Sequence, residues 1–386
     1  MNSQKGFTVW FLIAALPMLL FIACKSDTTT VPPEAQAVVE RIGKRHVPDK
    51  RLGVYNIQLE RKAKELIVSG DVLNAALPTM LIDSLRHAAK GFTITNQIQT
   101  LPQESLREQN YGIITVSVAN MYGEPRYSAE LVNQTVMGTV VRLLKEDDGF
   151  YYVQNWDRYL GWLPPGSVEE VDYTKAQQWQ NSSKVVCLAN YGTVNEQVAG
   201  NGAIGDCLTD LVPGAALRRI SDGAGYYKVE TPDGRLGYVK KEVAVEESAL
   251  QRVQTTRENI LLTARKFLGI PYLWGGTSAK GFDCSGYVQT VYRLNNFLLP
   301  RDANQMEAEG VKVDRGEDFE NVQPGDLLFF GPRPERIIHV AIYLGDHLYI
   351  HSSASVHINS LDPEHDLYNE YRHKTLQSIK RVLPNS

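Results

Sequence analysis

A cysteine in the last third of the chain has surroundings that suit a catalytic nucleophile. Cys284 stands in Gly281-Phe282-Asp283-Cys284-Ser285-Gly286, and apolar residues at helical spacing follow it, so we expect it at the start of a helix. Unpaired backbone N–H groups and the positive end of the helix dipole favour a thiolate there, and the same N–H groups can donate to an oxyanion. A lone cysteine at a helix start is more often structural, so its chemistry depends on partners.

Two histidines supply those partners. His339 lies in an apolar run typical of a buried strand, and His351 ends the next such run, 12 residues further on. A turn at Gly345-Asp346 predicts an antiparallel pair that places the two histidines side by side. A histidine beside a thiol acts as general base, and a further polar group must fix its tautomer. We therefore predict Cys284 as nucleophile, His339 as base and His351 as the orienting group.

Metal binding is the rival use of cysteine and histidine side chains. Zinc sites usually contain closely spaced pairs such as Cys-x-x-Cys, and no two cysteines of this chain are that close. We therefore predict no metal site. The polar stretches near the C-terminus contain further histidines that we interpret as surface residues, namely His347, His357, His365 and His373.

The sequence around Cys284 and His339 also predicts the helix and the strand that must position them. Thr255 and Glu258 fit a capping box at the start of a helix, which Gly269 and Pro271 end. The run from Gly325 to Phe330 predicts a further buried strand. The expected fold of residues 255–386 is therefore α+β, with the cysteine-bearing helix packed on an antiparallel sheet.

Four segments of this region together resemble the NlpC-type peptidases, a papain-like family that cleaves cell-wall peptides. They are Asp283-Cys284-Ser285-Gly286, Pro324-Gly325-Asp326-Leu327, His339-Val340-Ala341-Ile342-Tyr343 and Ile350-His351. The resemblance extends from about Thr255 to the C-terminus. It implies a papain-like catalytic domain that needs no cofactor and a murein peptide as substrate.

An internal repeat precedes this domain. Gly138, Gly149, Tyr151, Val153 and Gly161 recur 76 residues later as Gly214, Gly225, Tyr227, Val229 and Gly237. Each copy contains short β-rich runs separated by turns, which is typical of a small barrel or sandwich. The copies, 111–172 and 183–247, resemble bacterial SH3-like domains, and a segment rich in Gln and Ser, 172–183, links them.

Two SH3-like domains before such a catalytic domain resemble one branch of the family, the γ-D-glutamyl-L-diamino acid endopeptidases. Tyr272-x-Trp274-Gly-Gly and Pro300-Arg301-Asp302 add to this resemblance. It implies that the Cys284 thiolate attacks the γ-carbonyl of D-glutamate. In that branch the first SH3-like domain covers the cleft, where an acidic residue and a tyrosine enclose the free amine of an N-terminal L-alanine. The substrate-binding residues implied here are Tyr272, Trp274, Asp283, Ser285, Asp302, Tyr159 and Glu124.

Other functions stay open from the sequence. If the papain-like module were inert, the chain would be a wall-binding lipoprotein, although the intact Cys, His, His set argues against this. An endopeptidase that attacks polymeric peptidoglycan, or an amidase or acyltransferase, would use the same residues on the same scaffold.

The N-terminus has the pattern of a targeting segment. Lys5 precedes an apolar run, Phe7 to Ala23, and the ending before Cys24 resembles a bacterial lipobox. We expect a signal peptide at 1–23 and lipid attachment at Cys24, with a plain secretory signal or an uncleaved anchor as the alternatives. The protein would then be exported and held on a bacterial membrane, facing the periplasm or the cell exterior.

Residues 24–110 predict a polar tether followed by a helical region, because Leu66, Ile67 and Leu73 belong to a series of apolar residues at three- and four-residue spacings. The whole chain carries 40 basic and 44 acidic side chains, a net charge of -4, which does not favour a nucleic acid partner. Cys187 and Cys207 could form a disulfide in an exported protein, or both could be buried free thiols.

Overall fold

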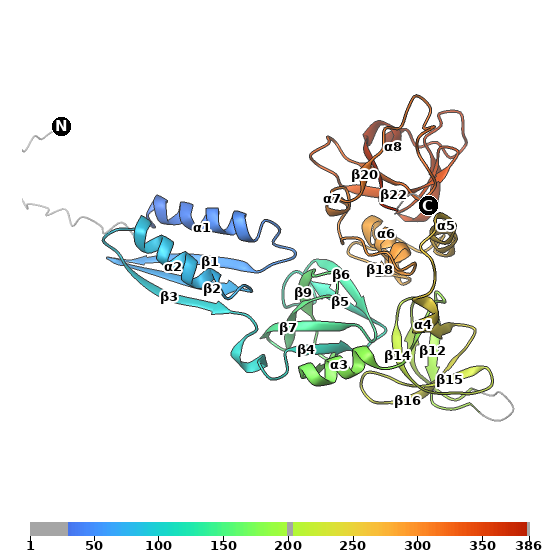
Figure 1. The fold of residues 1–386 in the computed structure, drawn as a ribbon, viewed down its shortest axis with the longest axis horizontal. Helices are drawn as coiled ribbons and strands as arrows, with labels where there is room; N and C mark the ends of the chain where they lie inside the picture. The colour runs from blue at the N-terminus through green and yellow to red at the C-terminus, as the bar shows by residue number, and fades with distance from the viewer. Residues whose placement is uncertain (1–29, 199–203, 384–386) are drawn as a thin grey trace, which may run out of the picture.

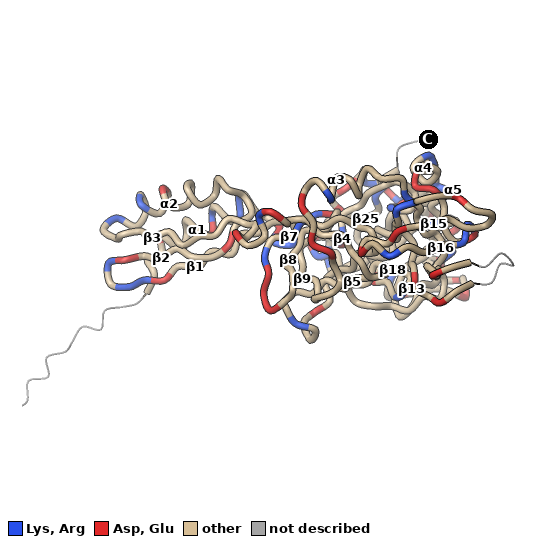
Figure 2. Tube along the Cα trace, turned by 90° about the horizontal axis from the view of Figure 1, so that it is seen from below, with Lys and Arg blue, Asp and Glu red and all other residues tan. Residues whose placement is uncertain are grey.

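The computed structural model describes residues 30–198 and 204–383, which form an N-terminal unit, two β units and a C-terminal unit (Figure 1). The predicted signal peptide and Cys24 lie outside the described residues. Within the described ranges, no helix has the length and apolar character needed to cross a membrane. Basic and acidic residues are interspersed along the trace, so neither sign of charge dominates it (Figure 2).

The N-terminal unit is a three-stranded sheet with two helices (Figure 1). Its elements are α1 (Pro33–His46), β1 (Tyr55–Lys62), β2 (Glu65–Val72), α2 (Leu77–Ala88) and β3 (Thr93–Thr100). β1 and β2 are antiparallel, whereas β2 and β3 are parallel, and α2 forms the crossover that a parallel pair requires. Apolar side chains of both helices and of β2 form one buried cluster.

The helical interpretation of this region is right for α1 and α2 and wrong for the three strands. Leu66, Ile67 and Val68 are buried in succession in β2. A strand buried on both faces lacks the alternation by which a strand is recognised, and short apolar runs fit a helical period equally well.

The two β units share one topology. The first follows a short 3₁₀ helix, η1 (Glu104–Leu106), and contains β4 (Tyr111–Ile114), β5 (Val118–Tyr122), β6 (Leu131–Val136), β7 (Val140–Asp147), β8 (Phe150–Gln154), β9 (Leu160–Leu163) and β10 (Val168–Val171). The second contains β11 (Lys184–Cys187), β12 (Gly192–Asn195), β13 (Cys207–Leu211), β14 (Ala216–Asp222), β15 (Tyr226–Glu230), β16 (Leu236–Lys240) and β17 (Ala244–Glu246). The strand orders are β10-β4-β7-β8-β9-β5-β6 and β17-β11-β14-β15-β16-β12-β13, so each strand has its counterpart, and the internal repeat is confirmed.

The repeated glycines at positions 138 and 214 have a clear backbone reason. Gly138 and Gly214 have φ angles of 82° and 88°, in the left-handed region that side chains rarely adopt. The linker between the units is the helix α3 (Tyr173–Asn181), whose Trp179 Nε1 donates to the Gly138 carbonyl at 2.8 Å. The linker is therefore packed against the first unit rather than extended.

The two cysteines of the second β unit are free thiols. Cys187 is buried and Cys207 is exposed. Neither alternative left open by the sequence describes this pair fully, because no disulfide joins them and only one of them is buried.

The C-terminal unit packs helices against a six-stranded antiparallel sheet of order β20-β25-β21-β22-β23-β24. Its helices are α4 (Glu247–Leu250), α5 (Arg257–Lys266), α6 (Cys284–Arg293), α7 (Ala303–Met306) and α8 (Glu370–Thr375). Its strands are β18 (Thr277–Ser278), β19 (Gly281–Phe282), β20 (Val311–Lys312), β21 (Leu327–Phe330), β22 (His339–Gly345), β23 (Leu348–Ser353), β24 (Ser355–Ser360) and β25 (Leu376–Arg381). α6 contacts β22 and β23, so the predicted α+β arrangement, with the cysteine-bearing helix on an antiparallel sheet, is confirmed.

A buried glutamine joins the first β unit to the C-terminal unit. Gln134 in β6 accepts hydrogen bonds at its Oε1 from the Thr277 N–H and the Ser278 hydroxyl, both at 3.0 Å. Its backbone carbonyl accepts a third from the Thr277 hydroxyl at 3.1 Å. These contacts fix β6 beside the segment that leads to Cys284.

Candidate active site

Cys284 is the first residue of α6, and its thiol is buried. Asp283 caps the helix by accepting a hydrogen bond from the Gly286 N–H at 2.6 Å. Burial raises the pKa of the Cys284 thiol to about 12, and the Asp283 charge acts in the same direction. Hydrogen bonds from the backbone N–H groups of Val340 and Ser285 oppose this rise. The thiol is therefore protonated at rest, whereas a helix start alone led us to expect a thiolate.

His339 and His351 lie on adjacent strands, β22 and β23, with His339 Nε2 2.8 Å from His351 Nδ1. Both side chains are buried. Burial lowers the pKa of His339 well below its usual value and that of His351 to about 3. Both rings are therefore neutral near pH 7, as a base and its orienting partner must be.

The hydrogen bonds fix the tautomer of each ring. Asn359 in β24 places Oδ1, which can only accept, 3.0 Å from His351 Nε2, while its Nδ2 donates to the Leu367 carbonyl at 3.3 Å. His351 Nε2 therefore carries the hydrogen, and His351 Nδ1 accepts from the Nε2–H of His339. The remaining ring nitrogen, His339 Nδ1, is left with a lone pair that can take the proton of Cys284.

His357 is not the surface residue that we expected. Its ring centroid lies 4.5 Å from that of His351, and its Nε2 lies 3.1 Å from Asn359 Oδ1. A cavity of about 300 Å³ is lined by both Cys284 and His339, so the predicted nucleophile and the predicted base face one space. The histidines and Asn359 form one hydrogen-bonded series behind that space.

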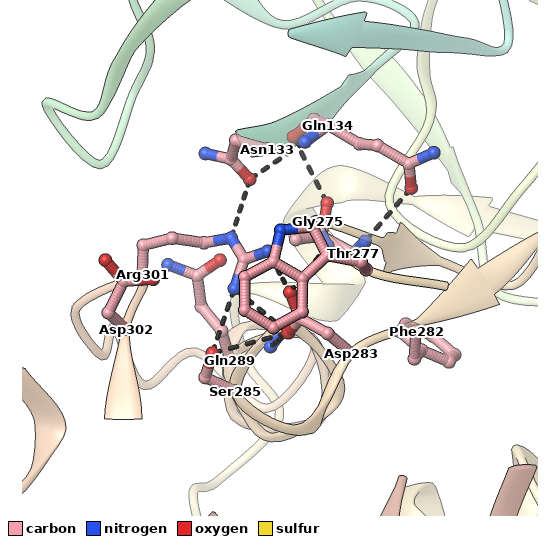
Figure 3. A network of polar contacts seen from close by, with 12 residues as sticks. Asn133, Gln134, Gly275, Thr277, Phe282, Asp283, Ser285, Gln289, Arg301 and Asp302 are labelled. Atoms are coloured by element: carbon pink, nitrogen blue, oxygen red, sulfur yellow. Dashed lines mark hydrogen bonds and ion pairs between the residues drawn. The ribbon is translucent and has the colours of Figure 1, made fainter. Parts of the chain in front are cut away.

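A fully buried arginine, Arg301, forms the centre of a polar network that includes Asp283 and Ser285 (Figure 3). Its Nη2 lies 2.5 Å from Asp283 Oδ2, and its Nη1 donates to the Ser285 hydroxyl at 3.0 Å. Its Nε donates to Asn133 Oδ1 of β6 at 2.9 Å. The two residues that flank Cys284 are thus held by a cation that also binds the first β unit.

A larger cleft, of about 360 Å³, also reaches Cys284. Residues of the N-terminal unit, the first β unit and the C-terminal unit contribute to its walls. It brings together six of the predicted substrate-binding residues, namely Tyr272, Trp274, Asp283, Ser285, Asp302 and Tyr159. The first SH3-like unit therefore contributes part of the wall of the cleft beside Cys284.

Asp302 has two partners inside this cleft. Its Oδ2 accepts a hydrogen bond from the Tyr159 hydroxyl at 3.1 Å and pairs with Arg51 Nη1 at 2.6 Å. Burial and the neighbouring Asp302 charge raise the pKa of Tyr159 above its usual value, so its hydroxyl remains a donor. The charge of Asp302 is thus balanced by an arginine of the N-terminal unit, which the sequence gave no reason to place here.

The structure does not bring Glu124 to the cleft. Glu124 is exposed and pairs with Arg126 at 3.0 Å. Glu130, at the end of the same loop, lines the cleft and accepts a hydrogen bond from the Trp274 indole at 2.8 Å. Sequence reasoning missed Glu130, and also Arg51 and Asn359, because none of them belongs to a recognisable motif.

The helix α6, the six-stranded sheet and the buried Cys–His–His series are together typical of a papain-like cysteine peptidase, here with SH3-like units before its catalytic domain. Residues 269–381 match the NlpC/P60 family model, and residues 121–168 match the model of the bacterial dipeptidyl-peptidase Sh3 domain. Dipeptidyl-peptidase 6 of Lysinibacillus sphaericus is 30% identical over 280 residues, which cover 69% of this chain and 97% of that protein. The chain therefore belongs to the NlpC/P60 family of cell-wall cysteine peptidases.

Two further similarities agree with this. A γ-D-glutamyl-L-lysine dipeptidyl-peptidase of Bacillus subtilis is 38% identical over 138 residues, which cover 35% of this chain and 44% of that protein. The crystal structure of an NlpC/P60 family protein from Bacillus cereus matches 71% of this chain and 100% of its own, with a TM-score of 0.61 and 23% identity. The structural match supports the fold.

Proposed function

We propose that the protein hydrolyses the γ-D-glutamyl-L-diamino acid bond of murein peptides and prefers free peptides with an N-terminal L-alanine. The observation that carries this proposal is the composition of the larger cleft, in which carboxylates and Tyr159 lie together close to Cys284. Its volume of about 360 Å³ is at the small end of ligand pockets, which suits a short peptide better than a polymer. The name of the similar γ-D-glutamyl-L-lysine dipeptidyl-peptidase of Bacillus subtilis supports the same bond.

In the proposed reaction, His339 Nδ1 takes the Cys284 proton as the sulfur attacks the γ-carbonyl of D-glutamate. The oxyanion receives hydrogen bonds from the Cys284 N–H at the start of α6 and from the Tyr272 hydroxyl. His339 then protonates the departing amine of the diamino acid, which leaves an acyl-enzyme. A water molecule, deprotonated by the same nitrogen, hydrolyses the thioester, while His351 holds the ring throughout.

Recognition of the free amine is assigned to Glu130 rather than Glu124. Two carboxylates of the cleft already have arginine partners, since Arg51 pairs with Asp302 and Arg301 pairs with Asp283. Glu130 pairs with no Lys or Arg within residues 30–198 and 204–383. It is the cleft carboxylate whose charge a substrate ammonium would balance.

The test compares L-Ala-γ-D-Glu-L-Lys, its diaminopimelate analogue and the same stems attached to muramic acid, with products identified by mass spectrometry. Free peptides should be cut at least about tenfold better in kcat/KM, because an acylated amine leaves the carboxylate of the cleft desolvated and unpaired. Cys284→Ala and His339→Ala should abolish hydrolysis. Equal rates on free and attached stems would favour an endopeptidase of polymeric peptidoglycan, and wall binding without turnover in the unmodified protein would favour a binding lipoprotein.

We further propose that the protein is exported and anchored to a membrane through a lipid on Cys24. The sequence pattern around Cys24 supports this proposal. Each buried methylene of an acyl chain contributes about 0.8 kcal/mol to membrane attachment. Metabolic labelling with a radioactive fatty acid should mark the unmodified protein and not Cys24→Ser, and persistent label on that variant would exclude this site.

A further inference from the structure

A short helix near the C-terminus places an arginine beside the nucleophile. Arg372 lies in α8, where the Asn369 side chain caps the helix by accepting a hydrogen bond from the Arg372 N–H at 3.0 Å. The arginine lines the smaller cavity, of about 300 Å³, together with Cys284 and His339. Its charge is close enough to help hold the pKa of His339 below the usual value. Arg372 is therefore part of the surroundings of the reacting groups.

The guanidinium of Arg372 has aromatic neighbours but no anionic one. Its central carbon lies 5.6 Å from the ring centroid of Phe330 and 5.5 Å from that of Tyr371. In the part of the chain that the structure describes, no aspartate or glutamate forms an ion pair with it. By contrast, Arg301 pairs with Asp283 and Arg381 pairs with Asp326. Arg372 is partly buried, and a partly buried cation without a counter-ion is ready to bind an anion.

The two cavities that meet at Cys284 differ in their unpaired charge. In the larger one the charges of the two arginine–aspartate pairs balance each other, and Glu130 is a carboxylate with no basic partner among the described residues. The smaller one is lined by no acidic residue and contains Arg372. Both are also lined by Tyr272, so both adjoin the nucleophile. A peptide that crosses Cys284 with its amine towards Glu130 directs its other end towards Arg372.

We propose that Arg372 is a substrate-binding residue that pairs with the α-carboxylate of the leaving diamino acid, so that the preferred substrate ends at that residue. This inference rests on the proposed function, in which the dipeptide portion occupies the larger cleft. The planar fork of a guanidinium matches a carboxylate with two parallel hydrogen bonds. The cavity of about 300 Å³ on this side offers space for the leaving diamino acid. The enzyme would then recognise both ends of a free tripeptide.

The experiment compares L-Ala-γ-D-Glu-L-Lys with the same peptide ending in a carboxamide, which has the same shape and no terminal charge. We expect the unmodified enzyme to prefer the acid about tenfold in kcat/KM, the usual effect of a hydrogen bond to a charged group. Arg372→Gln should reduce that ratio to about one, because it should slow hydrolysis of the peptide acid and not of the peptide amide. Arg372→Lys should retain part of the preference. Lys374→Gln is the matched control, because Lys374 is a 72% exposed cation of the same helix and should leave the ratio unchanged.

Two results would overturn the inference. If the unmodified enzyme hydrolyses the peptide acid and the peptide amide at equal rates, no group of the enzyme recognises the terminal carboxylate. Equal slowing of both peptides by Arg372→Gln would show that the arginine acts on the chemistry of Cys284 and His339 or on folding. Calorimetric binding to Cys284→Ala separates this inference from the proposed function. Absence of turnover would exclude the proposed function. The carboxylate site would still be supported if Cys284→Ala binds the acid peptide more tightly than the amide peptide and if the double variant Cys284→Ala, Arg372→Gln loses this difference in affinity.

Discussion

Arg51 of the N-terminal unit lies with its Nη1 2.6 Å from Oδ2 of Asp302 in the catalytic domain, at the wall of the substrate cleft. Asp49 forms a second ion pair with this arginine, with 2.7 Å between Arg51 Nη2 and Asp49 Oδ2. The Gln305 side chain donates a hydrogen bond to Asp49 at 2.7 Å. The N-terminal unit lies outside both segments that match family models, 121–168 and 269–381. A unit that the family models do not describe therefore shapes this cleft.

Asp302→Asn tests what that ion pair does for the substrate. The amide can still cap α7, but the charge shared by Arg51 and the Tyr159 hydroxyl is lost. Because the pair is partly exposed, we expect a modest effect, a rise in KM of about two- to fivefold for the free tripeptide with little change in kcat. Steady-state kinetics will measure it, with the exposed Asp147→Asn as control. An unchanged KM would show that the pair does not position the cleft wall.

Glu130→Gln and Glu124→Gln form a matched pair of variants in one loop. We expect Glu130→Gln to lower kcat/KM for the free tripeptide about three- to tenfold, because the carboxylate that would meet the ammonium becomes neutral. The rate on the N-acetylated peptide should not change. Glu124 already pairs with Arg126 outside the cleft, so Glu124→Gln should behave like the unmodified enzyme. A loss of kcat/KM in Glu124→Gln and none in Glu130→Gln would show that Glu124 binds the amine.

These two glutamates show where sequence reasoning stopped. Cys284, His339 and His351 could be predicted because each lies in a recognisable local pattern, a helix start or one of two neighbouring strands, and because these segments together resemble the NlpC-type peptidases. The choice between Glu124 and Glu130 depends on how β6 docks through Gln134, which joins residues 143 positions apart. The partner of Asp302 is 251 positions away, in a unit with no motif. Contacts of that range arise from the packing of whole units, which no local pattern encodes.

Burial explains the other difference between expectation and structure. A helix start predicts a thiol with a lowered pKa, yet Cys284 is enclosed, and loss of solvation of its charged form has the larger effect. In the proposed reaction the thiol of Cys284 and the imidazole of His339 are therefore both neutral before the attack. The sequence predicted residues that the structure brings close together, but their protonation depends on how deeply they are buried.

Arg301→Met tests the buried network under the nucleophile. The substitution leaves Asp283 buried without its cation and also removes the bonds to Ser285 and Asn133. Loss of one partner of a buried pair costs about 3–5 kcal/mol, so the catalytic domain should unfold at clearly lower denaturant concentration. Arg126→Met, which breaks an exposed pair, is the control and should leave the midpoint unchanged. A midpoint for Arg301→Met equal to that of the control would show that the network does not stabilise the fold.

The last prediction concerns the loss of stability in acid. Burial lowers the pKa of His351 to about 3 in the folded protein, whereas an unfolded chain titrates near 6.5. Below about pH 6.5 the unfolded state therefore binds a proton that the folded state does not, and stability falls with pH until about pH 3, by up to about 1.4 kcal/mol per pH unit. His351→Asn cannot titrate, so its free energy of unfolding should fall less steeply between pH 6 and pH 4.

Urea unfolding of the catalytic domain at several pH values will measure that slope, and His46→Asn, which changes an exposed histidine of α1, should leave it as in the unmodified protein. Carboxylates titrate in every variant, so the difference between slopes isolates His351. The asparagine can still accept the hydrogen bond from His339 Nε2–H, and measurable hydrolysis should remain because an orienting group can be partly replaced. Identical slopes in His351→Asn and the unmodified protein would mean that His351 has the same pKa in the folded and the unfolded state, so that burial does not keep its ring neutral in acid.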